Sequence, residues 1–310
     1  MKGSAFDVIG DIHGQADKLH ALLKRLGYTP SAGTYRPPAG RQAVFIGDLI
    51  DRGPAQIEVL RLVRGMIDAG HARAVMGNHE FNAIGYVTPN PDRPGEFLRP
   101  HCPKNLKQHR EFLAQVGEGS PEHRNWIEWF KTLPVALALD GIRAVHACWR
   151  DEDVARVQSA TSHGRLDECF LHRAYQQHSP DYHAMECLLK GIEIALPNGT
   201  SYVDHGGVLR RDARTRWWLP EPQSYREVVI VEPHRVGDIP EAPLPNDYQP
   251  LPVHGSPVFV GHYWMRGTPQ VQAPKVACVD YSAASDGPLV AYRWEGEITL
   301  DAGNFVAVGA

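Results

Sequence analysis

The sequence has few cysteines, and none of the five stands in a C-x-x-C pair. An odd, scattered set of this kind is typical of reduced thiols in a cytoplasm. The chain also has no apolar run of membrane-spanning length, and no charged-then-apolar leader precedes the first apolar segment. These absences favour a cytoplasmic protein without a membrane partner.

An excess of positive charge is missing as well. The formal net charge is -4 and the pI is about 6.5, so no overall basic surface points to nucleic acid as a partner. The sequence contains no internal repeat and no low-complexity tract. Its 310 residues are 43% hydrophobic, which is enough to bury a full-sized core. We expect a single domain over residues 1–310, with a lid-like insertion between about 155 and 255.

Strand and helix patterns alternate in the first eighty residues. Apolar runs at 6–9, 43–46 and 72–76 predict buried strands, and apolar residues at helical spacing over 19–26 and 57–67 predict the helices between them. This is the pattern of a parallel βαβαβ unit with right-handed crossovers, and hence of an α/β fold.

The rest of the chain is less regular. Helices are predicted over 105–116 and 121–132, and residues 155–195 read as largely helical. Proline-rich residues 232–257 indicate an extended surface excursion. Strands are predicted at 142–145, 258–260 and 276–279, followed by a hairpin of 289–294 and 297–300.

Each of the three early strands ends in a glycine-bounded turn that carries Asp, His or Asn. The turns are Gly10–Gly14, Gly47–Gly53 and Gly77–Glu80. In open α/β sheets ligands bind beyond the carboxyl ends of the strands, so the turns are expected to form one composite site. An Asp before a Gly is more often a helix cap when it stands alone, but three matching turns in order favour a metal site.

The candidate metal ligands come from these turns and from the ends of two later strands. They are Asp11, His13, Asp48, Asn78, His146 and His262. Carboxylate, amide and imidazole donors without a thiolate suit Mn, Fe, Zn, Co or Ni better than Ca or Mg. We expect two divalent ions, with Mn as the first choice and the Asp48 carboxylate as the bridge. Such a pair can activate water and hold both oxygens of a phosphoryl displacement.

The remaining motif residues suggest catalytic roles. His79 is not needed as a ligand and is expected to protonate the leaving oxygen, with Asp51 orienting its imidazole. Arg52 has a planar fork suited to phosphate oxygens, and Asn78 is expected to contact the same phosphate. Glu80 either caps the following helix or supports the site. Most other histidines, including His109 and His123, are expected at the surface.

The three turns resemble those of the calcineurin-like metallophosphoesterase superfamily. The sequence from Gly47 to Gly53 is similar to the phosphoprotein-phosphatase branch, which also holds bacterial diadenosine-tetraphosphate hydrolases. The resemblance implies a central β-sandwich flanked by helices in four α/β/β/α layers, and direct attack by a metal-bound hydroxide. It also implies two ligand sets. They are Asp11, His13 and Asp48 at one ion, and Asp48, Asn78, His146 and His262 at the other.

Two departures from that branch bear on the substrate. Ala147-Cys148-Trp149 follows His146, where the phosphoprotein phosphatases usually carry Gly-Gly. The branch also has a second phosphate-binding arginine between the two later histidines. Arg211, Arg214 and Arg216 are candidates for it, and Arg214 is our choice. The arginines beside Trp217-Trp218 either form a solvated face or line a polyphosphate pocket.

The middle region resembles no eukaryotic protein phosphatase. We therefore expect a small phosphorylated substrate, such as a nucleotide or a dinucleoside polyphosphate. A phosphoserine/phosphothreonine protein phosphatase is the second hypothesis. A nucleic-acid-end phosphatase or phosphodiesterase is the third, and the acidic balance counts against it. A non-catalytic metal-bound interaction module is the fourth, and it predicts the loss of a ligand or of His79, all of which are present.

Overall fold

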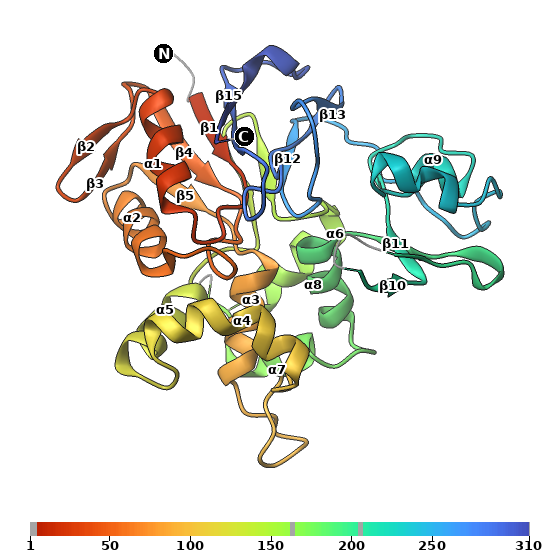
Figure 1. Cartoon of the computed structure of the whole chain (residues 1–310), viewed down its shortest axis with the longest axis horizontal. Coiled ribbons are helices and arrows are strands. Elements are labelled where there is room, and N and C mark those ends of the chain that lie inside the picture. Colours follow the sequence, from red (N-terminus) through yellow and green to blue (C-terminus); the bar gives the residue numbers. More distant parts are fainter. Residues whose placement is uncertain (1–4, 162–164, 204–206, 310) are drawn as a thin grey trace.

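The computed structural model describes residues 5–161, 165–203 and 207–309, and within them two five-stranded sheets form the core (Figure 1). The first sheet has the order β16-β15-β1-β4-β5, in which β1, β4 and β5 run parallel and β15 and β16 are antiparallel additions. Its strands are β1 (Ala5–Ile9), β4 (Arg41–Phe45), β5 (Ala72–Ala74), β15 (Leu289–Trp294) and β16 (Phe305–Val308). The predicted parallel βαβαβ unit is confirmed.

The second sheet has the order β13-β14-β12-β7-β6. Its three central strands β14, β12 and β7 run parallel, while β13 and β6 pair antiparallel at the edges. The strands are β6 (Ala136–Ala138), β7 (Arg143–Val145), β12 (Val258–Val260), β13 (Val271–Ala273) and β14 (Val276–Cys278). The carboxyl ends of β7 and β12 lead directly to His146 and to the Gly261-His262 turn.

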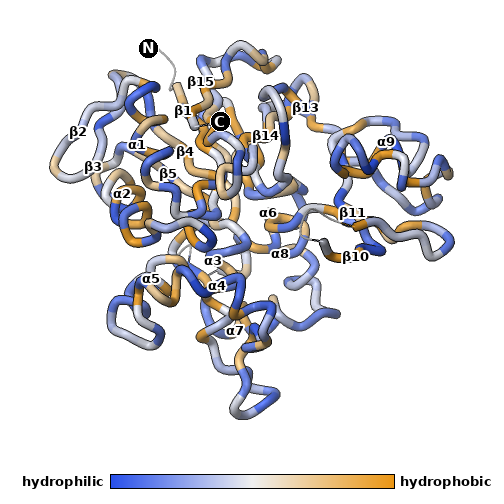
Figure 2. Tube along the Cα trace, viewed as in Figure 1, coloured by the Kyte–Doolittle hydropathy of each residue, from blue (hydrophilic) through white to orange (hydrophobic). Residues whose placement is uncertain are grey.

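The two sheets bury one apolar layer between them, because side chains alternate across each strand. Phe6, Val8 and Val44 of the first sheet belong to the same buried cluster as Phe259 and Ala277 of the second. The alternate residues of these strands join a larger cluster with the helices. Figure 2 shows apolar colouring along the central strands and on stretches of the helices around them. The predicted sandwich with flanking helices is confirmed.

Helices α1 (Ala16–Arg25) and α2 (Gln56–Asp68) cover the outer face of the first sheet (Figure 1). Leu19, Leu22 and Leu23 are fully buried on α1, as their helical spacing predicts. A small hairpin, β2 (Thr29–Ser31) and β3 (Thr34–Arg36), connects α1 to β4. Helices α3 (Asn78–Val87), α4 (Pro103–Val116) and α5 (Pro121–Phe130) follow β5. This arrangement leaves the carboxyl ends of the parallel strands open toward α3.

Residues 151–250 contain a helical part and an irregular lobe. The helices are α6 (Asp151–Ala160), α7 (Glu168–Ala174) and α8 (Pro180–Lys190). The lobe holds β8 (Glu193–Ala195), β9 (Tyr202–Val203), β10 (Leu209–Arg210), β11 (Asp212–Arg214), α9 (Tyr225–Val228) and the 3-10 helix Pro233–Asp238. It has a buried cluster of its own around Ile194, Ala213 and Val228, and it projects from the sandwich in Figure 1. We call residues 193–250 the lobe.

One predicted strand is wrong. Residues 297–300 are irregular, and the partner of β15 is β16, eight residues later than the predicted hairpin requires. Polar contacts explain the difference, since Glu297 accepts hydrogen bonds from the side chains of Tyr292 and Asn304. These bonds close the loop between β15 and β16. Among the described residues, no helix is both long and apolar enough to cross a membrane.

Candidate metal centre

The predicted ligands meet at the carboxyl ends of strands from both sheets. Among the described residues, nine non-glycine residues have a positive φ, and most of them lie in these strand-end turns. The six in the site are His13, Asp48, Asp51, Arg52, His262 and Trp264. A positive φ is a strained backbone conformation for a residue other than glycine, so the surrounding structure must hold these residues in it. The backbone strain is therefore concentrated in the turns that form the candidate site.

Asp48 lies at the centre of the group. Its Oδ2 is 3.5 Å from His13 Nε2, 3.4 Å from His146 Nε2 and 3.8 Å from His79 Nε2. Its Oδ1 accepts a hydrogen bond of 2.9 Å from the His79 backbone N–H. The side chain is almost fully buried. This position between both histidine groups is the one that a bridging carboxylate needs.

Asn78 joins the two later histidines. Its Oδ1 lies 3.0 Å from His146 Nε2 and 2.8 Å from His262 Nδ1. Asp48, His146 and His262 form one group whose ligand atoms lie within 4.8 Å of one another, and His13, Asp48 and His79 form another. Asp11 borders the same space, since its Oδ2 accepts a hydrogen bond from the His262 N–H. The structure brings all six predicted ligands together.

The protonation pattern of the ligands fits a divalent cation. His13 Nδ1 and His146 Nδ1 each lie 2.7 Å from a backbone carbonyl, of Ile50 and Ile46 respectively. Each Nδ1 therefore carries the donated proton, which leaves a lone pair on Nε2 facing the Asp48 carboxylate. Within the described residues, His13 Nε2, His262 Nε2 and Asp11 Oδ1 are buried without a hydrogen-bond partner. Acceptors crowded in this way are satisfied by a cation between them.

Electrostatics point the same way. Burial lowers the pKa of the His13 and His262 imidazoles well below the usual value, which keeps them neutral and able to ligate. Burial also lowers the pKa of His146, but the Asp48 carboxylate outweighs it and raises that pKa to about 10. Asp48 thus attracts positive charge strongly at the point where the ligands converge. The donor set of carboxylate, amide and imidazole fits two divalent ions of the expected class.

Two glycines make the close approach of the turns possible. A Cβ at Gly77 would lie 2.2 Å from Asp48 Oδ1, and one at Gly261 would lie 2.1 Å from Asp11 Oδ1. Both distances are shorter than any real side-chain contact. The motif glycines are therefore needed for packing between turns, because the ligand carboxylates occupy the space of the missing side chains.

His79 and Asp51 form a hydrogen-bonded pair beside the ligands, as predicted. His79 Nδ1 lies 2.5 Å from Asp51 Oδ2. The second oxygen of Asp51 lies 2.8 Å from Nδ1 of His109, on α4. Burial raises the pKa of the Asp51 carboxyl, but the hydrogen bonds from His109 and His79 outweigh burial and hold that pKa well below its usual range. Asp51 is thus an anion that faces two imidazoles.

The surface position predicted for His109 and His123 is wrong. Their exposed fractions are 4% and 1%. His109 Nδ1 faces Asp51, and His123 Nδ1 accepts a hydrogen bond from the Gly119 N–H. Sequence reasoning missed His109 because it stands in a polar helical stretch. Its signal was spacing: His109 lies one helical turn before Leu113, on the buried face with Phe112 and Val116.

Arg52 stacks on an aromatic ring next to the candidate metal ligands. Its guanidinium carbon lies 3.9 Å from the centroid of the Trp264 ring, a cation–π distance. Its Nη2 lies 3.4 Å from His79 Nε2. Asp280 Oδ2 accepts a hydrogen bond of 2.7 Å from the Trp264 N–H and so holds that residue in its strained conformation. Trp264 and Asp280 were not among the predicted site residues.

The three candidate arginines lie in different surroundings. Arg214 Nη1 donates to the His262 carbonyl at 3.0 Å, which places its guanidinium at the edge of the ligand group. Arg216 Nη1 donates to the Glu227 carbonyl within the lobe. Arg211 is exposed. The Trp217 and Trp218 side chains are buried, so they do not offer a stacking surface.

Glu80 does both of the things that the sequence left open. Its Oε2 accepts hydrogen bonds of 2.9 Å from the N–H groups of Gly77 and Asp48, and its Oε1 accepts one of 2.8 Å from Leu49. The first bond caps the start of α3, and the other two fix the Asp48 turn. Buried beside Asp48, the carboxyl has a pKa raised to about 6, with burial as the main cause.

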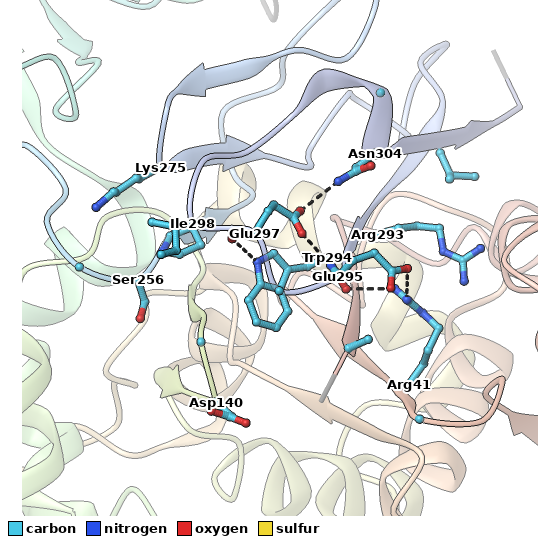
Figure 3. A pocket seen from close by; sticks show the side chains of 18 of the residues that line it. Arg41, Asp140, Ser256, Lys275, Arg293, Trp294, Glu295, Glu297, Ile298 and Asn304 are labelled. Atoms are coloured by element: carbon cyan, nitrogen blue, oxygen red, sulfur yellow. Dashed lines mark hydrogen bonds and ion pairs between the residues drawn. The ribbon is translucent and has the colours of Figure 1, made fainter. Parts of the chain in front are cut away.

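A hollow of about 1360 Å³ lies at the end of the sandwich opposite to the candidate metal centre. It is lined by Arg41 at the start of β4 and by Trp294 at the end of β15. Figure 3 shows Arg41 paired to Glu295, and Glu297 paired to Asn304. This is the amino end of the parallel strands, away from the edge where ligands bind in such folds.

Comparison with known proteins places the chain in a family. The model of the calcineurin-like phosphoesterase family matches residues 5–258. This protein therefore belongs to the calcineurin-like phosphoesterase family, in agreement with the resemblance of its three turns.

Curated relatives include bis(5'-nucleosyl)-tetraphosphatases of two kinds. The asymmetrical enzyme PrpE of Bacillus subtilis is 47% identical over 87 residues, which are 28% of this chain and 36% of PrpE. The symmetrical enzyme of Aromatoleum aromaticum is 30% identical over 174 residues, which are 54% of this chain and 55% of that protein. The chain thus spans about half or less of the length of these relatives. A solved serine/threonine phosphatase from Saccharomyces cerevisiae, similar to human PP5, has 17% identity and a TM-score of 0.47, over 99% of this chain and 80% of its own.

Proposed function

We propose that this chain hydrolyses phosphate ester or anhydride bonds with two divalent metal ions, and that its substrate is a nucleotide or a dinucleoside polyphosphate. The observation that carries the proposal is the convergence on Asp48. Four imidazoles, one amide oxygen and the Asp11 carboxylate surround this buried carboxylate. The hydrogen-bonded pair of His79 and Asp51 lies beside them, together with Arg52, whose guanidinium suits a phosphate group.

Six residues would hold the ions. They are Asp11, His13, Asp48, Asn78, His146 and His262, with Asp48 shared between the two sites. When bound, two divalent ions supply Lewis-acid activation of water and neutralise phosphoryl charge. Mn is our first choice of metal, and Fe, Zn, Co and Ni suit the same donors.

The side chains around the ions would handle the substrate. Arg52 lies beside His79 and Arg214 beside His262, and together with Asn78 they would orient the phosphoryl group. His79 Nε2 faces the same space and would give its proton to the leaving oxygen. Asp51 fixes the imidazole through Nδ1, so Nε2, which lies 3.2 Å from Gln108 Nε2 and 3.4 Å from Arg52 Nη2, is the nitrogen that would meet the substrate.

The relatives support the substrate class. Both kinds of curated relative are tetraphosphatases of bis(5'-nucleosyl) compounds, and the arginines near the site suit a substrate with several phosphates. We further propose that residues 1–310 act as one metallophosphoesterase domain in which residues 155–255 serve as a lid-like insertion. The cytoplasmic location stays a prediction; the cysteines are all free thiols.

A substrate panel tests the proposal. The purified, Mn-loaded protein is offered diadenosine tetraphosphate, nucleoside tri- and monophosphates, a phosphothreonine peptide, a 2',3'-cyclic nucleotide and p-nitrophenyl phosphate. We expect kcat/KM to be highest for the dinucleotide. A preference for the peptide would make the chain a protein phosphatase instead. No turnover of any compound, with metal bound, would favour the non-catalytic module.

A further inference from the structure

A cavity of about 580 Å³ lies between the lobe and the core next to the metal centre. On the core side it is lined by Arg52 and by residues 263–266, which directly follow the ligand His262. On the lobe side it is lined by residues of β9 and β11, by residues 230–233 and by Arg235. Arg52 lines the cavity and also lies beside His79, and Arg214 lines it and bonds the His262 carbonyl, so the cavity borders the candidate metal centre.

Positive charge dominates the lining of this cavity. Within the described residues, six arginines line it, against three carboxylates. The arginines are Arg52, Arg210, Arg214, Arg216, Arg235 and Arg266. The chain as a whole is acidic, so this local excess runs against the overall balance. Guanidinium groups bind phosphate oxygens with two parallel N–H groups, which makes such a lining well suited to phosphates.

Two lobe arginines have donors to offer. Arg216 uses Nη1 on the Glu227 carbonyl. Arg235 uses Nη1 on Asp238, at 3.2 Å. Its Nε is buried and has no hydrogen-bond partner within the described part of the chain. An unsatisfied buried donor of this kind is costly, and an anionic ligand would satisfy it.

We propose that this arginine pocket binds the distal phosphates of a polyphosphate chain whose scissile phosphoryl group lies at the metal centre. The inference rests on the proposed function. Arg52 and Arg214 serve the reacting phosphoryl, and Arg216 and Arg235 of the lobe serve the phosphates beyond it. The lobe thereby makes the site selective for substrates with several linked phosphates, since a monophosphate reaches only the first pair of arginines.

Equilibrium binding tests the pocket apart from catalysis. Mn-loaded His79→Ala protein, in which turnover is slow, is titrated calorimetrically with adenosine 5'-tetraphosphate and with AMP. We expect Arg216→Ala and Arg235→Ala each to raise the Kd for the tetraphosphate about tenfold, the usual effect of losing a hydrogen bond to a charged group. The Kd for AMP should change less than twofold. Arg211→Ala is the matched control, since this exposed arginine does not line the cavity.

Several outcomes would overturn the inference. One is an equal loss of affinity for the tetraphosphate and for AMP, and another is no loss for either variant. Thermal unfolding of each variant shows whether it is folded, and Arg235, at the surface of the lobe, provides a second test if Arg216→Ala does not fold. If the pocket binds tetraphosphate but the wild type hydrolyses no polyphosphate, the proposed function is wrong and the pocket stands. If hydrolysis occurs and neither arginine affects binding, the pocket is wrong.

Discussion

Asp51 holds two imidazoles at once, with His79 on one carboxylate oxygen at 2.5 Å and His109 on the other at 2.8 Å. His79 comes from the start of α3 and His109 from the middle of α4. The carboxylate therefore connects the start of α3 to a helix that contributes none of the candidate metal ligands. Held by both contacts, Asp51 would keep the His79 ring in one orientation, which is what proton transfer to a leaving group requires.

Removal of the His79 imidazole should slow hydrolysis while metal stays bound. A general acid contributes about 10²- to 10⁴-fold, so we expect a loss of kcat in that range for His79→Ala. The loss should be small on p-nitrophenyl phosphate, whose leaving group needs no proton. Steady-state kinetics on both substrates, with metal content measured in parallel, provide the check. Unchanged turnover of a substrate with a poor leaving group would remove His79 from the acid role.

Removal of the second partner of Asp51 should have a smaller effect. In His109→Leu we expect kcat to fall about tenfold with metal content unchanged, because a supporting hydrogen bond to the catalytic pair is lost. His123→Leu is the matched control, since His123 is a buried neighbouring histidine with no bond to Asp51. Equal rates for the two variants would show that His109 only fills space.

The same variant predicts a pH dependence of stability. A carboxyl whose pKa is depressed by folding stabilises the protein above its unfolded-state pKa, about 3.9, and loses this contribution as the pH falls through the folded value. Removing His109 raises the folded pKa of Asp51 toward normal. The difference in unfolding free energy between wild type and His109→Leu should therefore shrink as the pH is lowered below about 4. Denaturant titrations at several pH values measure it, and a constant difference would refute the assignment.

Glu80 should matter for stability as well as for activity. In the wild type, three backbone N–H groups donate to the two oxygens of the Glu80 carboxylate. In Glu80→Gln an NH₂ group replaces one of these oxygens, so at least one backbone N–H loses its acceptor. Leaving one buried donor unsatisfied costs about 1–3 kcal/mol of unfolding free energy. Glu168→Gln, in the exposed first turn of α7, should change it by less than about 0.5 kcal/mol. A Glu80 variant as stable as the control would show that these bonds are replaced.

Much of the core and of the ligand set was predictable because both depend on local patterns. The apolar runs at 6–9 and 43–46 predict their strands directly. The turns that follow parallel strands all lie at the same edge of the sheet, at the carboxyl ends of the strands. Asp11, His13, Asp48 and Asn78 therefore meet as expected. His146 and His262 also follow strands, and the pairing of β7 with β12 brings them together.

Other features depend on contacts between distant segments. The stack of Trp264 on Arg52 joins residues 212 positions apart, and no spacing in the sequence encodes it. The position of His109 follows from the packing of α4 against the site, and the strand β16 was hidden by the closing of a loop around Glu297. The arginine pocket likewise exists only because the lobe folds back beside residues 263–266.

The most direct test of the account is the metal stoichiometry of wild type and of Asp48→Asn, measured by elemental analysis after saturation with Mn and removal of excess ion. We expect two ions per wild-type chain. The variant should lose metal and activity together, because both ligand groups share this carboxylate. Two ions retained at full stoichiometry in Asp48→Asn would contradict the account, since Asp48 would then not be the bridge.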